Sequence, residues 1–241
     1  MLLLGLDTAT PAVTVALHDG TRVLAQATTV DKRRQAELLM PAIAQVLDEA
    51  GAERADLTAI AVGVGPGPYT GLRVGLVTAR VLGSALGIPV HGACSLDIIA
   101  ADVTVTAGTG RRFLVATDAR RREVYYARYD EAGRLAGPLV DRPADVAGRD
   151  ALPAVGEGAW LYRDLFEAVE GPQYPAAATL ARVVAAELGA GSPGQSGRRV
   201  PLLAPEPLYL RRPDAREPGA PKRVTGTPPP SRPRGPARGG A

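Results

Sequence analysis

The sequence predicts an α/β protein that contains the same small β-meander twice. The first observation is an apolar strand, Leu2–Leu6, that ends at Asp7 and is followed by two more predicted strands at 13–17 and 22–28. The second is that residues 113–119 repeat this start, so that Asp118 corresponds to Asp7. The third is a glycine- and proline-rich loop, residues 63–75, placed between a predicted strand and a predicted helix. A repeat of this kind indicates two related subdomains, of which the second lacks a copy of the loop.

The other elements follow from hydrophobic periodicity and from turn residues. An Asp-Gly pair at 19–20 predicts the hairpin between the second and third strands. Helices are predicted over 33–50, from Thr70 as N-cap, over 95–103 from Ser95 as N-cap, and at about 161–169 and 177–188. Further strands are predicted at 57–62, 88–90, 113–119, 124–126, 135–140 and 206–210.

Charge divides the chain into an acidic globular part and a basic tail. The net charge is +3, but eight Arg and Lys residues from Arg211 onward face only Asp214 and Glu217. We therefore expect subdomains over 1–108 and 109–212, and a disordered tail rich in Pro, Gly and Arg over 213–241. The tail is either a solvated segment or a contact to RNA phosphates.

The cysteine content and the hydropathy of the sequence indicate the cellular compartment. The single cysteine, Cys94, excludes an intramolecular disulfide and favours a reducing compartment. The apolar start lacks the basic region of a signal peptide, and no apolar run approaches the ~20 residues that a membrane-spanning helix needs. The sequence predicts a cytoplasmic protein without a membrane contact.

The glycine-rich loop predicts a site for an anion. Its glycines let backbone amides crowd together, and a helix N-terminus adds free N–H groups. It is neither a Walker loop nor a dinucleotide fingerprint. Asp7 and Asp118 would aim at the same cleft and suit a Mg-phosphate ligand, or else each merely caps its own turn. The candidate anion or nucleotide contacts are Asp7, Thr8, Gly65, Gly67, Thr70, Arg73, Asp118 and Glu123.

The helix after the loop carries small residues at every fourth position: Gly71, Gly75, Ala79 and Gly83. Each interior glycine costs roughly 1 kcal/mol of helix propensity relative to Ala, so a close neighbour must justify the pattern. Ridges at this spacing interdigitate in the commonest helix packing. The small-residue ridge is therefore either packed on the chain's own sheet or a docking surface for a second subunit.

Catalytic constellations are scarce. His18 and His91 have no partner at metal-ligand spacing, and Cys94 beside His91 is weak support for a nucleophile. The run Arg120–Arg122 is either an anion contact or a solvated turn.

The motifs together resemble one family. Residues 5–10 (GLDTAT), 65–75 (GPGPYTGLRVG), 117–125 (TDARRREVY) and 207–211 (PLYLR) are similar, in order and spacing, to the TsaB (YeaZ) family. The resemblance covers residues 2 to about 212. It implies a duplicated actin-like ATPase fold (ASKHA, ribonuclease H-like) with a reduced second subdomain.

The resemblance also implies a function. Members of that family are non-catalytic partner subunits that pair with the TsaD transferase, and with the TsaE ATPase, to make threonylcarbamoyladenosine in tRNA. Pairing as a heterodimer would use the helices at 33–50 and 70–86, with tRNA reached indirectly and homodimers possible through the same face. ATP or ADP at a subunit interface is possible, with no tightly bound cofactor or metal. The implied interface residues are Glu37, Leu38, Gly71, Leu72, Gly75, Ala79 and Gly83.

One departure and two alternatives remain. Relatives often carry a histidine where this chain has Gln35. The main alternative is a small ATPase or sugar-kinase-like enzyme that uses Asp7 and Asp118 around Mg-ATP. A peptidase ranks last, because no nucleophile, base and orienting group can be assembled.

Overall fold

The computed structural model of the protein describes residues 1–106, 112–149, 151–167, 170–189 and 200–210. Contacts divide the chain into one compact unit, Met1–Arg211, and the segment Arg212–Ala241. The predicted boundary at 108/109 and the predicted tail from 213 lie outside the described residues.

The first sheet has five strands in the order β3-β2-β1-β4-β5. β1 runs antiparallel to β2 and parallel to β4, so the carboxyl ends of β1 and β4 lie at the same edge. The hairpin at Asp19 closes the opposite edge, because His18 pairs with Leu3 at the start of β1. The strands are β1 (Leu3–Asp7), β2 (Ala12–His18), β3 (Val23–Val30), β4 (Ala59–Gly63) and β5 (Val90–Ala93).

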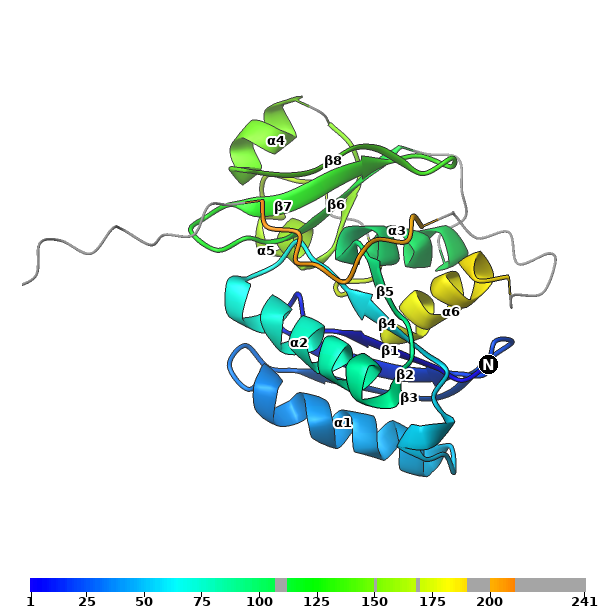
Figure 1. Cartoon of the computed structure of the whole chain (residues 1–241). Coiled ribbons are helices and arrows are strands. Elements are labelled where there is room, and N and C mark those ends of the chain that lie inside the picture. Colours follow the sequence, from blue (N-terminus) through cyan, green and yellow to red (C-terminus); the bar gives the residue numbers. More distant parts are fainter. Residues whose placement is uncertain (107–111, 150, 168–169, 190–199, 211–241) are drawn as a thin grey trace, which may run out of the picture. The chain divides into compact units, whose positions relative to one another are not determined.

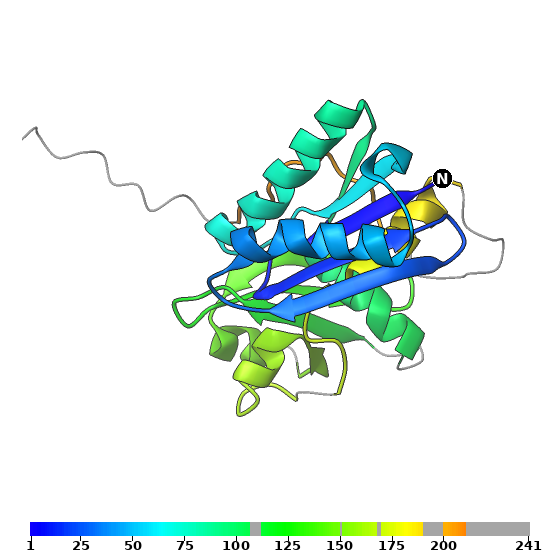
Figure 2. The ribbon, with the colours of Figure 1, turned by 90° about the horizontal axis from the view of Figure 1, so that it is seen from below.

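Helices cover both faces of this sheet (Figures 1 and 2). Residues of β1 alternate between the faces, as the pleat requires. Leu4 and Leu6 pack in one core with helices α1 (Gln35–Glu49) and α2 (Tyr69–Leu86), which contact each other. Leu3 faces a second core, formed with helices α3 (Ser95–Thr106) and α6 (Ala177–Glu187). A short 3-10 helix, Arg54–Asp56, precedes β4.

The second sheet repeats the first, which confirms the predicted duplication. Its order is β8-β7-β6-β9, with β6 antiparallel to β7 and parallel to β9. Asp118 ends β6 as Asp7 ends β1. The elements of this half are β6 (Phe113–Asp118), β7 (Val124–Tyr129), β8 (Arg134–Asp141), α4 (Pro143–Arg149), β9 (Ala154–Val155) and α5 (Glu157–Leu161).

The glycine-rich loop has a shortened counterpart in this half, which corrects the sequence prediction. β9 runs parallel to β6 and leads through Gly156 into α5, as β4 leads through the loop into α2. Gly156 and Gly158 lie against the backbone of Ala116, where an added Cβ would collide. A strand of two residues and a helix of about one turn are too short to give a periodicity that can be recognised in a sequence.

The two halves exchange helices, so the subdomain boundaries drawn from the sequence do not describe the packing. Helix α6 belongs by sequence to the second half but packs on β1 and β2. Gly5 makes this possible, because a Cβ there would lie 2.7 Å from the carbonyl oxygen of Ala177. Helix α3 lies between the two sheets and contributes residues such as Ile99 to the core of the second.

Three local predictions are wrong. Helix α2 begins at Tyr69 after Pro68, and no side chain caps it, so Thr70 is not the N-cap. Of the helix predicted at 161–169, only Leu161 is helical among the described residues 161–167, as the last residue of α5. Residues 206–210 form no strand: they belong to an extended strap, residues 200–210, whose single bridge joins Leu203 to Gly92.

Candidate functional site

The glycine-rich loop is held between β1 and α3. The Gly65 N–H donates to Ser95 Oγ (3.2 Å), and the Ser95 N–H donates to the Gly65 carbonyl oxygen (2.8 Å). Gly67 lies on the backbone of Ala9, where any side chain would collide. Gly65 and Gly67, predicted as anion contacts, are thus engaged inside the protein, Gly65 with Ser95 and Leu72 and Gly67 with Ala9.

Asp7 is a buried structural carboxylate. Its Oδ2 accepts a hydrogen bond from Ser95 Oγ (2.6 Å), and its Oδ1 accepts one from the Ala9 N–H (2.7 Å). It occupies the space that a Cβ on Gly63 would need. Burial raises the pKa of Asp7 to about 6, although both hydrogen bonds lower it. The carboxylate ties β1 to α3 and turns no free oxygen toward a ligand.

The small-residue ridge of α2 packs on the tip of β1. Thr8 Oγ1 donates to the Gly71 carbonyl oxygen (2.7 Å) and accepts a bond from the Gly75 N–H (2.9 Å). A Cβ on Gly75 would lie 2.6 Å from that hydroxyl, and one on Gly83 would collide with Val90. Ala79 and Leu72 are also fully buried. The expectation that these five residues contact a partner is therefore wrong, and the internal-packing alternative is correct.

A basic cavity of about 350 Å³ lies beside the start of α2. Of the predicted anion contacts, it is lined by Thr8 and Thr70, whereas Asp7, Arg73, Asp118 and Glu123 do not line it. The remaining lining residues are Thr10, Pro11, Lys32, Arg33, Gln35, Pro68, Gly71 and Arg120. Three basic side chains and a helix N-terminus at one cavity favour a phosphate or carboxylate.

Asp118 is engaged within the second half. It accepts a hydrogen bond from the Arg120 N–H (2.8 Å) and pairs with the Arg120 guanidinium (3.4 Å). Residues 120–122 all have positive φ (61°, 55° and 61°), a conformation that costs each roughly 1–2 kcal/mol. Glu157 lies close enough to Asp118 to interact with it, because burial and then the charge of Asp118 raise the pKa of Glu157. Glu157 also pairs with Lys32 of the first half (3.9 Å).

The outer face of α2 is the exposed one. It carries Tyr69, Arg73, Val77 and Val81, again at every fourth residue, and it lies opposite the small-residue ridge because two residues turn a helix by about 200°. Val77 and Val81 are 57% and 61% exposed. We call this set the outer stripe of α2. The same spacing in the sequence could have revealed it, as the complement of the ridge.

Helix α1 adds to this exposed surface. Glu37 and Met40 are exposed, and Leu38 is half-buried against the core. Met40 is 42% exposed. Of the seven interface residues that the resemblance implied, Glu37 and Leu38 are the two that reach the surface.

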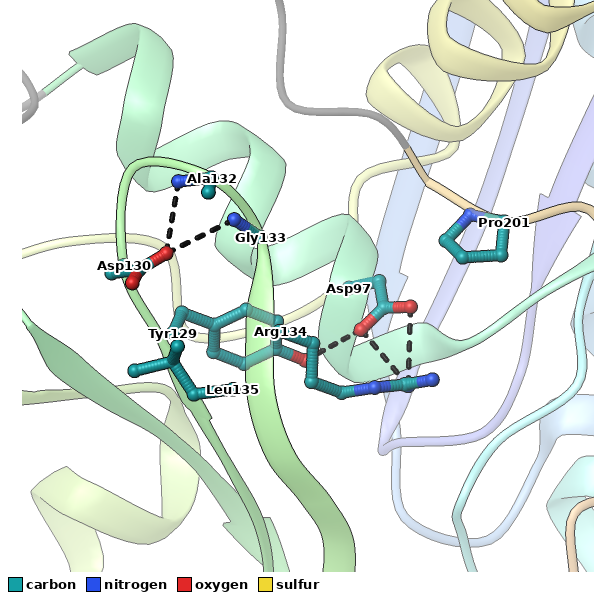
Figure 3. Close-up of a pocket in the computed structure, with 8 residues that line it drawn as sticks. All are labelled: Asp97, Tyr129, Asp130, Ala132, Gly133, Arg134, Leu135 and Pro201. Atoms are coloured by element: carbon teal, nitrogen blue, oxygen red, sulfur yellow. Dashed lines mark hydrogen bonds and ion pairs between the residues drawn. The ribbon is translucent and has the colours of Figure 1, made fainter.

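A second pocket, of about 290 Å³, lies where α3 meets the second sheet (Figure 3). Its polar groups are engaged with one another: Arg134 Nη1 donates to both oxygens of Asp97 (3.1 and 3.2 Å), and the Tyr129 hydroxyl donates to Asp97 Oδ1 (2.7 Å). Asp130 caps the turn beneath by accepting from Ala132 and Gly133. This buried network joins α3 to the β7–β8 hairpin.

Among the described residues, neither a reactive cysteine nor a cluster of metal ligands is found. Cys94 is fully buried, and burial raises the pKa of its thiol to about 12. Such a thiol is not a nucleophile at neutral pH. In the described part of the chain, no group of three or more His, Cys, Asp or Glu side chains could hold a metal ion. Nor does any described helix have the length and hydropathy to cross a bilayer.

Duplicated meanders, a parallel fourth strand in each half and exchanged helices define the class of actin-like ATPase folds. Within this class, the family model of TsaD, tRNA N6-adenosine threonylcarbamoyltransferase, matches residues 22–175. The structure of YeaZ from Pseudomonas aeruginosa superposes with a TM-score of 0.69 at 30% identity, over 87% of this chain and 99% of that one. The chain belongs to the TsaB (YeaZ) family.

Sequence relatives agree with this assignment. TsaB of Bacillus subtilis, a tRNA threonylcarbamoyladenosine biosynthesis protein, is 35% identical over 144 residues, 58% of this chain and 60% of that protein. An uncharacterized protein of Mycobacterium leprae is 45% identical over 223 residues. That match covers 89% of this chain, which spans about half of the relative's length (56%).

Proposed function

We propose that this protein is a non-catalytic scaffold and activator subunit for the threonylcarbamoylation of adenosine in tRNA. Membership of the TsaB family supports the pathway. The observation that carries the scaffold role is the outer stripe of α2, where Val77 and Val81 are more than half exposed on a helix whose other face is firmly packed. Exposed apolar side chains in a row on a rigid helix are typical of a protein interface.

The partner in this proposal is the TsaD transferase subunit. The chain itself matches the family model of that transferase, so the partner is expected to present related helices. Two such faces can pack helix on helix about a pseudo-twofold axis, as isologous surfaces do. A homodimer through the same face is the competing state when the transferase is absent. TsaE would dock on the pair, and tRNA would be reached indirectly in the cytoplasm.

The contacts of the two repeated aspartates support a subunit without its own catalysis. Asp7 is buried with both oxygens hydrogen-bonded inside the protein, and Asp118 is paired with Arg120. Neither lines the basic cavity, so an ATPase of the sugar-kinase type would lack its Mg²⁺-binding carboxylates there. The cavity itself suits a phosphate, and we propose that ATP or ADP binds there weakly, without hydrolysis.

The decisive experiment separates pairing from folding. Val77→Glu and Val81→Glu place a charge on the outer stripe, and Leu139→Glu places one at a similarly exposed position (46%) on β8 as a matched control. We expect the two α2 variants to lose co-purification with the transferase and to lose tRNA modification in the reconstituted system. All three should keep the native melting temperature. Normal pairing by both α2 variants would refute the proposed face.

Turnover by the purified protein is the second test. We expect no ATP hydrolysis above background, and ATP-dependent modification only when the transferase is added. Hydrolysis by the isolated chain that is lost in Asp118→Asn, but kept in Asp141→Asn, would instead favour the ATPase alternative.

A further inference from the structure

The strap brings a residue from the far end of the described chain to the first turn of α2. Leu203 exchanges two backbone hydrogen bonds with Gly92 on β5 (both 2.8 Å), and the Leu208 N–H donates to the Val64 carbonyl oxygen (2.8 Å). In Figure 1 the strap is the orange segment that passes beside α3, between α2 and the second sheet. Tyr209 follows directly and lies beside the outer stripe.

Tyr209 holds two members of that stripe. Its ring stacks on Tyr69, with centroids 5.4 Å apart and planes 22° from parallel. The guanidinium of Arg73 lies 4.1 Å from the centroid of the Tyr69 ring, and its Nε donates to the Tyr209 hydroxyl (3.0 Å). The guanidinium is thus fixed on one face and at one edge. An exposed arginine held in this way has given up much of its rotamer freedom before any partner arrives.

The fixed guanidinium keeps its terminal nitrogens for another group. Among the described residues, no carboxylate pairs with Arg73. A planar guanidinium fork matches a carboxylate in a bidentate pair. The next residues of the same stripe are Val77 and Val81, so an anion here would sit beside apolar contacts. That combination favours a protein surface over RNA, whose interfaces are more polar.

We propose that Tyr69, Arg73 and Tyr209 form a preorganised clamp that receives a carboxylate side chain of the transferase subunit. The inference rests on the proposed function and extends the docking surface from α2 to the C-terminal strap. Tyr209 acts as a positioning residue, through Arg73. The clamp therefore makes pairing depend on α2 and on the strap, which are far apart in the sequence.

The test measures the dissociation constant of the full-length chain and purified transferase, by calorimetry at low and high salt. Arg73→Ala should weaken binding about tenfold at low salt and less at high salt, within the range of an interface anchor. Arg73→Lys should behave like Arg73→Ala, because an ammonium cannot form the fork. Tyr209→Phe should weaken binding by about threefold, since it keeps the ring stack but loses the hydrogen bond.

Controls make each outcome decisive. Arg22→Ala, at the exposed hairpin on the opposite edge of the sheet, should bind as the native chain does. If Val77→Glu abolishes pairing while Arg73→Ala does not weaken it, the clamp is wrong and the proposed function stands. If neither variant changes pairing, both the clamp and the proposed docking face on the outer stripe of α2 are wrong. The clamp would also be wrong if Arg73→Lys bound the transferase as tightly as the native chain does. The same holds if the Arg73 variants lost affinity for tRNA but kept their affinity for the transferase.

Discussion

The hydroxyl of Ser95 donates a 2.6 Å hydrogen bond to the carboxylate of Asp7 in the interior of the protein. The two residues are the last of β1 and the first of α3, so this bond fixes the strand end against the helix that lies between the two sheets. The serine expected to cap its own helix instead satisfies a buried acid. Asp7, which suggests a Mg-phosphate ligand in the sequence, is therefore a structural residue that joins β1 to α3.

Asp7 should make the stability of the protein depend on pH. Its pKa is about 6 in the folded state, against 3.8 for an aspartate in water, so the folded state binds the proton more tightly than the unfolded state does. The stabilisation is fully present below about pH 4 and is lost as the pH rises through 6, a change on the order of 3 kcal/mol. Urea unfolding at several pH values should show this fall for the native chain and a flatter profile for Asp7→Asn.

The same profile in both proteins would contradict the shifted pKa. Asp141→Asn is the control, because that surface carboxylate has its pKa lowered, mainly by a hydrogen bond from Arg149. A lowered pKa stabilises the folded protein above the ordinary pKa of an aspartate, and this stabilisation is lost as the pH falls. Asp141→Asn should therefore change the stability at neutral pH and keep the fall in stability through pH 6.

Gly75→Ala tests the direction in which the ridge faces. The new methyl group would meet the hydroxyl of Thr8 at 2.6 Å, so we expect a loss of about 1–3 kcal/mol in the free energy of unfolding. Gly148→Ala is the matched control: it is also helical, and nothing lies within 4 Å of the added atom. It should be neutral or stabilising by up to about 1 kcal/mol. A Gly75→Ala protein of native stability that no longer pairs with the transferase would restore the ridge as a docking surface.

Arg134→Met tests the network of Figure 3. It removes the cation beside Asp97, whose side chain is only 5% exposed, and should cost about 3 kcal/mol of unfolding free energy. Arg149→Met removes an arginine whose ion pair with Asp141 is exposed, and should cost much less, because solvent screens an exposed pair. Equal losses in chemical denaturation would show that the buried network does not hold α3 on the second sheet.

Two truncations separate the strap from the residues after it. A chain ending at Arg212 keeps the strap and should retain the native melting temperature and affinity for the transferase. A chain ending at Pro205 loses Leu208 and Tyr209, with their contacts to Val64, Tyr69 and Arg73. It should melt at a lower temperature and pair more weakly. A defect in the first truncation would place an essential contact beyond Arg212.

The sequence by itself determined the duplicated meander, because a short apolar strand that ends in Asp and is followed by a turn is a local pattern, present at Asp7 and again at Asp118. It also determined the glycine-rich loop. It could not determine the exchange of α3 and α6, which depends on contacts between residues far apart, such as Gly5 with Ala177 and Ala181.

Which side of α2 faces the solvent was likewise decided by the tertiary structure alone. Helix α2 carries two stripes at four-residue spacing, and periodicity relates them to each other without saying which one meets the sheet. Thr8 settles this, because its hydroxyl bonds the backbone at Gly71 and Gly75, and only residues without bulk fit over it. The outer stripe is then exposed by necessity. Its clamp could not be foreseen either, since Tyr209 reaches Arg73 across 136 positions of the chain.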